Sequence, residues 1–515
     1  MKRLLAILAA ACVMLTGCSS LSDHAQTALD EKISARYIES LEDGIVLTQI
    51  SNNFYKTEQN ANPISPNIYC ADPTAVEYNG RLYVIGTNDH QQYDAVGDDG
   101  SNTYEHIKSF VILSTEDMVN WTYHGIIDTG AIAPWIISSW APSIVSRVED
   151  DGLTHFYLYF SNSGWGVGVI TATDPLGPWT DPLGRPFITP DTEGLTNCPV
   201  PFDPGAVIDD NGVGWLSFGA GTAPGGTKQM PGANRIVRLG EDMLSFASEF
   251  AVIPAPYAFE ASELNYINDT YVYTYNTSWD SRMDWDYNVY KAPPTACSMA
   301  YMTTKTPLDP DSWVYRGDYL YNPGEAGLDY SNNHSHLHKY KDRWVVFHHT
   351  MLRQRNVGST TGGFRSLSVV DIPVNEETLE ITKVKPNETG AAQIGYLDPK
   401  KEQDGACLFT CGGIGYETEN GMVTAAKADE DGAWLYLKGV DFGEATEVFT
   451  AKVKGSGRIE IRLDSMSNPA AAAIEFSSSD YTGVYSQLDE SIAGVHDMYI
   501  MISHKDICLG SWQFI

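Results

Sequence analysis

The sequence predicts an all-β protein: a five-bladed β-propeller followed by a β-sandwich (jelly-roll) domain. Two observations predict the propeller. A two-strand pattern occurs five times, and its copies begin roughly 55 to 75 residues apart, which is the size of a propeller blade. The third observation is a series of short, evenly spaced strands from about residue 402 onward, which is typical of a sandwich.

Each copy of the pattern begins with a short apolar strand, passes through a polar turn, and continues as a strand rich in aromatic and β-branched residues. Two such strands around a turn are typical of a β-hairpin. The copies span residues 72–85, 141–160, 203–218, 259–275 and 333–347. Asp72, Asp203 and Glu260 open three of them. The repeat therefore predicts that three carboxylates point into one shared central funnel.

The repeat also sets the domain boundaries that we expect. Residues 36–395 form the propeller and residues 396–515 form the sandwich. Two long insertions interrupt the repeat, at 91–106 and at 278–294, and the second is rich in Trp and Tyr. Long loops at one rim of a rigid scaffold commonly bind ligands, so we expect substrate specificity to reside in these two segments.

The first 18 residues are typical of a bacterial lipoprotein signal peptide. Two basic residues precede an apolar run over 4–15, which is too short to span a membrane, and Leu15-Thr16-Gly17-Cys18 resembles a lipobox. We therefore expect an extracellular, cell-surface lipoprotein of a bacterium. Its lipid anchor would be on Cys18, followed by a polar tether over 19–35. The alternative is an ordinary secretory signal with a chance Cys.

The composition limits the kinds of partner. With 33 basic and 66 acidic residues, the formal net charge is −33, which argues against nucleic acid or an anionic membrane surface. The 29 Tyr and 12 Trp fit either β-sheet packing or platforms for sugar rings. The cysteines after Cys18 show no Cys-x-x-Cys spacing, so we expect buried packing residues rather than zinc ligands.

Three acids in one funnel match the needs of glycosidic bond hydrolysis. One carboxylic acid protonates the leaving oxygen, and a second carboxylate activates water or attacks the sugar carbon. A third acid keeps the pKa of the first one high through like-charge repulsion. Asp-Pro is also a plain turn dipeptide, but three acids at the same point of a fivefold repeat favour catalysis.

Five short segments resemble, in order, the successive blade motifs of glycoside hydrolase family 43. They are Cys70-Ala71-Asp72-Pro73, Trp140-Ala141-Pro142, Phe202-Asp203-Pro204, Phe259-Glu260-Ala261-Ser262 and Asn332-Asn333-His334. The resemblance covers about residues 60 to 390 and implies a five-bladed propeller that inverts the anomeric configuration. It implies that Asp72 is the general base, that Asp203 orients the acid and modulates its pKa, and that Glu260 is the general acid. The base and acid carboxyls of an inverting enzyme lie roughly 6.5–9.5 Å apart.

The same resemblance implies further site residues. His334 matches the family histidine beneath the active site, which often helps to hold calcium; the alternative is a satisfied core histidine. Arg365 resembles the arginine that contacts sugar hydroxyls, and its alternative is a surface ion pair. Trp140 either walls the sugar pocket or packs between blades. Glu263 competes with Glu260 as the acid, but strand alternation places it on the opposite pleat face and favours Glu260.

The C-terminal region resembles a family 6 carbohydrate-binding module. The matching segments are 439–443, 459–464, 494–499 and 512–514. The resemblance implies stacking aromatics, for which Tyr416, Tyr481 and Tyr485 are candidates. The acids that usually serve the module's structural calcium are incomplete at 404–406 and replaced near Gly510, which argues against calcium there. The alternative is a domain that only braces the propeller.

The resemblance to family 43 implies a glycosidase that acts on arabinose- or xylose-containing plant polysaccharide. We favour an inverting α-L-arabinofuranosidase that releases side chains from arabinoxylan. A β-xylosidase, an arabinanase, and a non-catalytic glycan-binding lipoprotein are the alternatives. The resemblance allows calcium in the propeller and implies no organic cofactor.

Overall fold

The computed structural model describes residues 38–41, 44–47, 56–57, 59–221, 232–282, 292–358 and 362–515. Its contacts define two compact units. The first contains residues 62–395 and 418–423, and the second contains residues 396–417, 424–515 and the described residues before 62. The described residues between 38 and 61 were expected in the propeller but group with the second unit, where the Ile45 amide donates to Glu460 Oε1 at 3.1 Å. The predicted signal peptide and tether lie outside the described residues.

Five antiparallel sheets make up the first unit, and each contains one copy of the repeated hairpin. Their strands are β3 (Ala71–Tyr78), β4 (Arg81–Thr87), β5 (Phe110–Thr115) and β6 (Trp121–Ile127); β7 (Trp140–Val148), β8 (Thr154–Ser161) and β9 (Val167–Ala172); β10 (Gly205–Ile208), β11 (Gly214–Phe218), β12 (Arg235–Arg238) and β13 (Ala251–Val252); β14 (Ala258–Ile267), β15 (Thr270–Thr277), β16 (Met299–Thr304) and β17 (Val314–Leu320); and β18 (Ser335–Tyr340), β19 (Arg343–Thr350) and β20 (Ser366–Asp371). A small hairpin, β21 (Val374–Asn375) with β22 (Glu380–Ile381), follows the last sheet.

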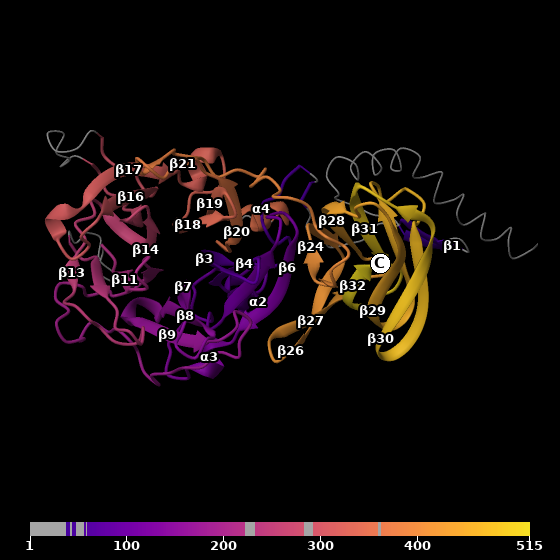
Figure 1. Cartoon of the computed structure of the whole chain (residues 1–515), viewed down its shortest axis with the longest axis horizontal. Helices are drawn as coiled ribbons and strands as arrows, with labels where there is room; N and C mark the ends of the chain where they lie inside the picture. The colour runs from indigo at the N-terminus through magenta and orange to yellow at the C-terminus, as the bar shows by residue number, and fades with distance from the viewer. Residues whose placement is uncertain are drawn as a thin grey trace, which may run out of the picture. The chain divides into compact units, whose positions relative to one another are not determined.

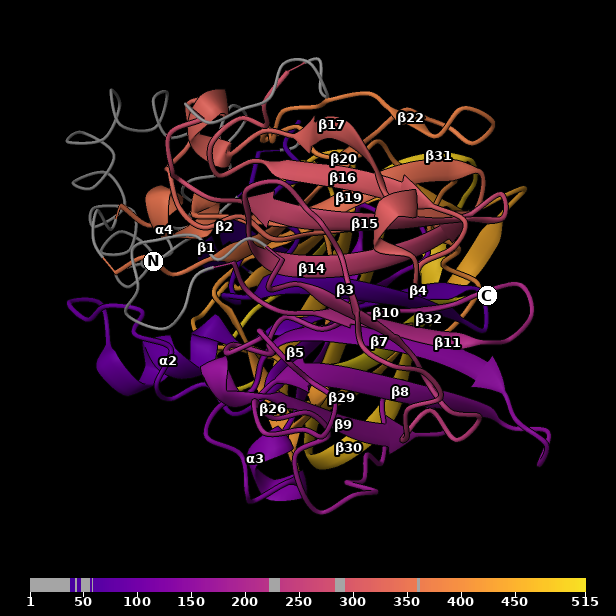
Figure 2. The same cartoon turned by 90° about the vertical axis from the view of Figure 1, so that its left-hand side faces the viewer.

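The first strands of the five sheets form a closed ring. β3 contacts β7, β7 contacts β10, β10 contacts β14, β14 contacts β18, and β18 returns to β3. Figure 1 shows β3, β7, β14 and β18 gathered around the middle of this unit, and Figure 2 shows β14, β15, β16 and β17 following one another outward. Five sheets arranged radially around a common axis are a β-propeller, so the predicted architecture is confirmed.

The segment before the first blade closes this ring by pairing with the last blade. The Ile64 amide donates to Leu367 O at 2.8 Å, and the Cys70 amide donates to Arg365 O at 3.0 Å. Asn62 adds a side-chain bond to the Val369 carbonyl at 3.0 Å. These bonds satisfy backbone groups on the outer edge of β20, and they bring the start of β3 beside Arg365.

Neighbouring blades pack face to face through apolar side chains. One buried cluster joins the first two blades through residues such as Ile112 and Leu158, and similar clusters lie between the later pairs. The six cysteines at 70, 198, 297, 407, 411 and 508 are buried and lie outside disulfides in the described residues, as expected for packing residues.

Short helices occupy several loops of the propeller. They are α2 (Asp89–Val96), α3 (Thr129–Ile132) and α4 (Leu352–Asn356), with 3₁₀ turns η1 (Ser163–Trp165), η2 (Pro310–Ser312) and η3 (Pro323–Ala326). The insertion expected at 91–106 is therefore partly helical, because the Asn88 side chain caps α2 by accepting from the Gln91 amide at 3.1 Å. Most of the second expected insertion, residues 283–291, lies outside the described residues. Figure 2 shows α2 and α4 on the same side of the unit.

The second unit is a β-sandwich, as predicted. Its strands are β1 (Ile38–Leu41), β2 (Gly44–Leu47), β23 (Gln403–Asp404), β24 (Cys407–Leu408), β25 (Thr410–Gly412), β26 (Ile414–Glu419), β27 (Met422–Ala428), β28 (Trp434–Asp441), β29 (Thr446–Leu463), β30 (Ala472–Ile492), β31 (Val495–Ile502) and β32 (Cys508–Phe514). The long strand β29 pairs with β32 through 449–454 and with β31 through 459–463. Gly455, at φ 116°, lies between these stretches, so the strand changes partners there. A buried core that includes Leu435, Ile461 and Trp512 fills the interior.

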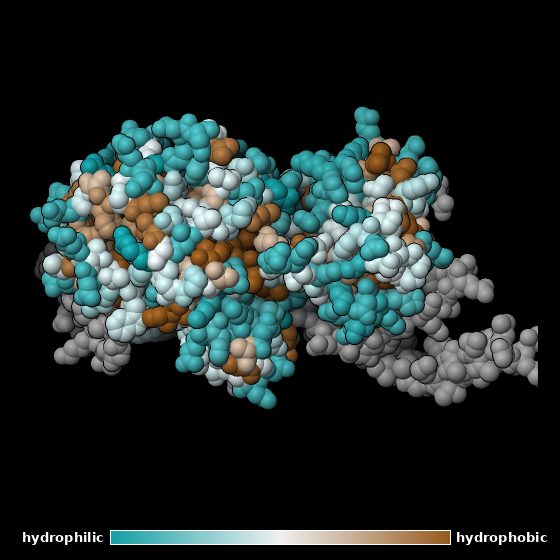
Figure 3. Space-filling view, turned by 90° about the horizontal axis from the view of Figure 1, so that it is seen from below, coloured by the Kyte–Doolittle hydropathy of each residue, from teal (hydrophilic) through white to brown (hydrophobic). Residues whose placement is uncertain are grey.

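On the face seen in Figure 3, hydrophilic residues prevail and hydrophobic residues are interspersed among them. In the part of the chain that the structure describes, no helix has the length and apolar character needed to cross a bilayer.

Candidate active site

Four residues near the openings of the first four blades adopt left-handed backbone conformations. Asp72, Ala141, Asp203 and Ala261 have φ values of 48°, 38°, 49° and 59°. Register shifts mark β-bulges at the same point in β3, β7 and β14. A non-glycine residue in this conformation costs of order 1–3 kcal/mol, so the surrounding structure has to hold it there.

Side chains of the preceding blades provide that support. Each of the four left-handed residues donates its amide N–H to one such side chain: Asp72 to His349 Nδ1 at 3.3 Å, Ala141 to Thr87 Oγ1 at 2.8 Å, Asp203 to Ser161 Oγ at 2.7 Å, and Ala261 to Asp203 Oδ2 at 2.7 Å. Thr87, Ser161 and His349 occupy corresponding positions at or next to the end of the second strand of a blade. The repeat thus brings three acids from separate blades to one place.

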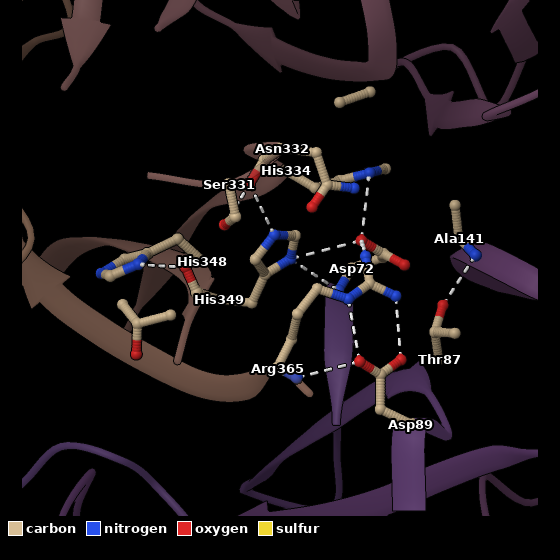
Figure 4. A network of polar contacts seen from close by, with 12 residues as sticks. Asp72, Thr87, Asp89, Ala141, Ser331, Asn332, His334, His348, His349 and Arg365 are labelled. Carbon is tan, nitrogen blue, oxygen red and sulfur yellow. Dashed lines mark hydrogen bonds and ion pairs between the residues drawn. The ribbon is translucent and has the colours of Figure 1, made fainter. Parts of the chain in front are cut away.

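Asp72 is held through one of its two carboxylate oxygens. Oδ1 accepts from the NH1 group of Arg365 at 2.8 Å, and it lies 3.3 Å from His349 Nδ1 and 3.7 Å from His334 Nδ1. Figure 4 shows these contacts converging on one oxygen while the other points away. Among the described residues, no side chain hydrogen-bonds Oδ2. Burial alone would raise the pKa of Asp72, but Arg365 and the two histidines outweigh burial and hold the pKa well below its usual range.

Asp203 has a different environment, because both of its oxygens accept hydrogen bonds. Ser161 donates to Oδ1 at 3.1 Å, and the Ala261 amide donates to Oδ2 at 2.7 Å. Burial and the nearby charge of Asp72 nevertheless raise the pKa of Asp203 to about 7. Asp203 is buried and both of its oxygens bind donors from neighbouring strands, an arrangement suited to organising its neighbours.

Glu260 precedes the bulge in β14 and is partly exposed. Burial raises its pKa to about 8, with further contributions from the negative charges of Asp203 and Asp72. Because Asp203 is held by two donors suited to its ionised form, the proton shared by these two acids belongs on Glu260. Glu260 therefore carries a proton at neutral pH while Asp72 is ionised.

Glu263 does not lie on the opposite face of β14 from Glu260, so the expectation from strand alternation is wrong. Glu260 pairs with Asn276 and Glu263 pairs with Thr274, two residues apart on β15, so the bulge takes up one residue and places both acids on the same face. The two acids differ instead in their position along β14. Glu263 is fully buried, and its Oε1 lies 3.3 Å from His336 Nδ1.

Arg365 lies between two carboxylates. Its NH1 group bonds Asp72, whereas its backbone amide, Nε and NH2 groups all donate to Asp89, at 3.0, 2.9 and 2.9 Å. Arg365 is 3% exposed and Asp89 is fully buried, so this is an internal ion cluster rather than the surface pair considered from the sequence. Direct contact of Arg365 with sugar stays a prediction.

His334 faces the two aspartates, with Nδ1 3.7 Å from Asp72 Oδ1 and 4.0 Å from Asp203 Oδ2. Burial lowers its pKa to about 4, which keeps the imidazole neutral. Calcium takes six to eight oxygen ligands, and the described residues contain no cluster of three or more His, Cys, Asp or Glu side chains placed to hold a metal. They therefore do not form a direct calcium shell, and calcium near His334 stays a prediction.

His349 links the base to the other side of the site. Its Nδ1 accepts from the Asp72 amide, and its Nε2 lies 3.0 Å from the Asn332 carbonyl, to which only an N–H can donate. A hydrogen bond from the Asn332 side chain to Glu260 lowers the pKa of that acid slightly, against the larger effect of burial.

Trp140 is the first residue of β7 and is partly exposed. Its Nε1 donates to the Tyr104 carbonyl at 3.2 Å, and the two rings meet edge to face with centroids 6.0 Å apart. The Tyr104 ring lies 5.0 Å from the Arg365 guanidinium. Trp140 thus borders the cluster from a second blade, in a position that allows contact with a bound sugar.

The three tyrosines considered for the second unit differ in environment. Tyr485, on β30, is 76% exposed. Tyr481 is partly buried and donates its hydroxyl to Glu417 Oε2 at 2.9 Å. Tyr416 lies on β26 and is also partly buried. Tyr485 is therefore the one among them with a broad open ring face.

Sequence reasoning missed Asp89, Ser161, His349, Asn332 and Tyr104. Ser161 and His349 carried a usable signal, because they recur with Thr87 in corresponding positions of their blades. Asp89, Asn332 and Tyr104 belong to segments outside the repeated hairpin strands, so no periodicity marks them.

Comparison with known proteins agrees with the fold. Residues 60–366 match the glycosyl hydrolases family 43, and residues 409–515 match the carbohydrate binding module (family 6). The chain is 32% identical over 474 residues to an arabinoxylan arabinofuranohydrolase of Bacillus subtilis strain 168, covering 86% of this chain and 89% of that protein. It is 30% identical over 487 residues to an arabinoxylan arabinofuranohydrolase of Paenibacillus polymyxa, covering 89% of this chain and 75% of the relative.

A solved structure extends this similarity to three dimensions. The crystal structure of a family 43 arabinoxylan arabinofuranohydrolase from Bacillus subtilis in complex with cellotetraose matches with a TM-score of 0.81 at 30% identity, covering 90% of this chain and 99% of that one. A five-bladed propeller with carboxyl groups of lowered and raised pKa at its centre is the architecture of a glycosidase. The chain belongs to glycosyl hydrolase family 43, with the arabinofuranosidase or xylosidase type of activity, and it carries a C-terminal family 6 carbohydrate-binding module.

Proposed function

We propose that this glycosidase is an inverting α-L-arabinofuranosidase that removes arabinose side chains from arabinoxylan. The observation that carries the proposal is the unequal state of two acids in one site. The pKa of Asp72 is held well below its usual range, whereas burial and two neighbouring charges raise the pKa of Glu260 to about 8. At neutral pH the site therefore offers one base and one acid, as hydrolysis of a glycosidic bond requires.

In the proposed reaction, Asp72 Oδ2 accepts a proton from a water molecule as the water oxygen bonds to the anomeric carbon. The bond from that carbon to the leaving oxygen breaks, and Glu260 donates its proton to the leaving oxygen. Asp72 ends protonated, Glu260 ends ionised, and the released sugar has the inverted configuration. Asp203 keeps the proton on Glu260 by its charge, and its bond to the Ala261 amide fixes the backbone next to the acid.

The proposed substrate rests on the names of the relatives and not on the carboxyl groups of the site. Two relatives that match most of this chain are named arabinoxylan arabinofuranohydrolases, and the family 6 module suits a polysaccharide substrate. A β-xylosidase or an arabinanase of the same family is the alternative, because all three use the same acids. Trp140 and Arg365 would border the sugar.

We further propose that the protein works outside the cell, anchored through a lipid on Cys18. The Leu-Thr-Gly-Cys sequence and the preceding apolar run support this. In bacteria that express the full chain, Cys18→Ser should move the protein from the membrane fraction to the soluble exported fraction. If the distribution does not change, the protein carries an ordinary signal instead.

Product analysis tests the enzymatic proposal. The purified protein is incubated with wheat arabinoxylan, debranched arabinan and xylo-oligosaccharides, and the products are separated by chromatography while NMR follows the first anomer released. We expect free arabinose of inverted configuration from arabinoxylan. Xylose from xylo-oligosaccharides, or oligomers from debranched arabinan, would select one of the other two enzymes.

Variants at the two acids test the assigned roles. Glu260→Ala and Asp72→Ala should each reduce kcat by roughly 10³-fold or more, because each removes a group that transfers a proton in the transition state. Azide can replace water when the base is missing, so rescue by azide is expected for Asp72→Ala only. Full activity of Glu260→Ala would remove Glu260 from the role of acid, and no turnover of any glycan by the parent protein would favour the non-catalytic binder.

A further inference from the structure

A second buried aspartate completes the cluster around Arg365. Asp89, the first residue of α2, is fully buried and accepts three hydrogen bonds from Arg365. Its Oδ2 also accepts from Asn102 Nδ2 at 2.7 Å. The carboxylate and the guanidinium thus form a bidentate pair, the most directional of charged hydrogen-bonding arrangements.

This pair determines how much of Arg365 reaches the base. Nε and NH2 are directed at Asp89, so only NH1 donates to Asp72. A guanidinium without a competing partner prefers to bond both oxygens of a carboxylate. The second anion therefore prevents Arg365 from covering Asp72 Oδ2, the oxygen that has to accept a proton from water.

Aromatic packing keeps Asp89 in place. The Tyr93 ring of α2 lies 5.1 Å from the Tyr69 ring and 5.3 Å from the Phe364 ring. The Arg353 guanidinium of α4 lies 3.9 Å above the centre of the Tyr69 ring. Tyr69 and Phe364 come shortly before Asp72 and Arg365 in the chain, so the helix, the base and the arginine share one packed support.

We propose that Asp89 is a positioning residue for the hydrolysis: it binds the fork of Arg365 so that one N–H holds Asp72 Oδ1 and Oδ2 stays open to water. The proposal rests on the function proposed above. Asp89 touches no reacting atom, and it acts through Arg365.

The charges around Arg365 give this role a distinct signature. Asp72, Asp89 and Tyr104 contribute to the pKa of Arg365, and Arg365 in turn lowers those of Asp203, Glu260 and His334. His349 and the buried thiol of Cys70 also face the cluster. Removing an anion from this set lowers the pKa of the remaining acids, and removing the cation raises it. Asp89→Asn and Arg365→Gln should therefore move the pH profile in opposite directions.

The experiment compares kcat, KM and the pH dependence of kcat/KM for Asp89→Asn, Arg365→Gln and the double variant. In Asp89→Asn, NH2 loses its anionic partner and turns to Asp72 Oδ2, so kcat should fall roughly tenfold to a hundredfold while KM changes little. The alkaline limb should move to lower pH in Asp89→Asn and to higher pH in Arg365→Gln. It should return towards the parent position in the double variant, which removes both charges.

Asp94→Asn is the matched control, because it makes the same change on the same helix at a side chain that is 67% exposed. We expect it to keep the kinetics of the parent protein. A crystal structure of Asp89→Asn adds a readout that needs no turnover, and Arg365 should bond both oxygens of Asp72. If Asp89→Asn does not fold, Asp89→Glu keeps the charge and should lower kcat without moving the alkaline limb.

The inference is overturned if Asp89→Asn keeps the parent kcat, if its alkaline limb moves in the same direction as that of Arg365→Gln, or if Arg365 keeps its single bond to Asp72 in the crystal. A kcat of Asp89→Glu equal to that of the parent protein would also overturn the inference. These outcomes differ from failure of the proposed function, in which the parent protein itself releases no sugar from any of the three substrates.

Discussion

At the scale of single residues, three carboxylic acids share one site but occupy different states. Asp72 faces cationic and imidazole groups, Asp203 faces two hydrogen-bond donors, and Glu260 faces two negative charges. Since an anion favours the protonated form of its neighbours, the two aspartates jointly keep a proton on Glu260. Which residue acts as the acid and which as the base thus depends on all three carboxylic acids together.

We expect Asp203→Asn to move the alkaline limb of the pH profile, which is the fall in activity at high pH. Activity of the parent protein should fall as pH rises through about 8, where Glu260 loses its proton. Asp203→Asn removes a negative charge beside Glu260, so the limb should move to lower pH by about one unit. The amide can still accept from Ala261, which preserves the backbone.

The measurement is the pH profile of kcat/KM on a soluble arabinofuranoside. Asp210→Asn serves as control, because Asp210 lies in an exposed turn of the same blade. An unchanged limb in Asp203→Asn would show that Asp203 does not set the pKa of Glu260.

Sequence reasoning found the residues that the repeat marks. Asp72, Asp203 and Glu260 stood out because they open corresponding blades, whereas Asp89 contacts Arg365, 276 positions later in the chain, outside the repeated strands. Spacing within one sequence carries no signal for such a contact. The expectation that Glu263 lies on the opposite face from Glu260 was wrong because of a β-bulge. Side chains alternate between the two faces only in a regular strand, and the bulge inserts one extra residue between these acids.

At the scale of elements, the blade openings depend on very close approach of neighbouring strands. Gly205 begins β10, and a Cβ there would lie 2.4 Å from Glu263 Cα and 2.8 Å from the adjacent backbone of β14. Only glycine allows the third and fourth blades to meet at this point. Their contact positions the segment that carries Asp203 relative to the strand that carries Glu260.

Gly205→Ala should therefore destabilise the protein by roughly 1–3 kcal/mol or more and lower kcat, because backbone atoms have to move apart. The measurements are chemical denaturation and the kinetics at saturating substrate. Gly164→Ala is the control, since its Cβ would meet only Val200 Cγ1 at 3.7 Å, an ordinary contact. Equal stability of the two variants would contradict the close approach.

The hairpins were predictable as elements because apolar strands and polar turns alternate along the chain. The helix at 89–96 was expected as a loop, because its first turn is polar and only Asp89 and Gln92 are buried. The bulges left no mark in the sequence either. Their left-handed residues are Asp and Ala rather than glycine, so ordinary turn signals do not reveal them.

At the scale of the whole molecule, the candidate active site and the family 6 carbohydrate-binding module belong to separate units. The strand pattern predicts a propeller over residues 36–395, whereas the described residues between 38 and 61 group with the second unit. Their place in the second unit depends on contacts with residues such as Glu460, more than 400 positions away.

Tyr485→Ala should weaken retention on insoluble arabinoxylan by about tenfold, equivalent to roughly 1.4 kcal/mol, and leave hydrolysis of a small soluble arabinofuranoside unchanged. The reason is that Tyr485 is 76% exposed and belongs to the unit that does not contain Asp72, Asp203 and Glu260. Pull-down with washed polysaccharide measures retention, and Val495→Ala, an exposed position on β31, is the control. Unchanged retention would favour a second unit that only braces the propeller.

The pairing of residues 62–70 with β20 has a consequence for biosynthesis. Asp72 emerges early from the ribosome, but Arg365 follows 293 residues later, and His334 and His349 also belong to the last blade. A nascent or prematurely terminated polypeptide that stops before this blade holds an aspartate without its guanidinium partner. The base thus gains its guanidinium partner only after the last blade has been synthesised.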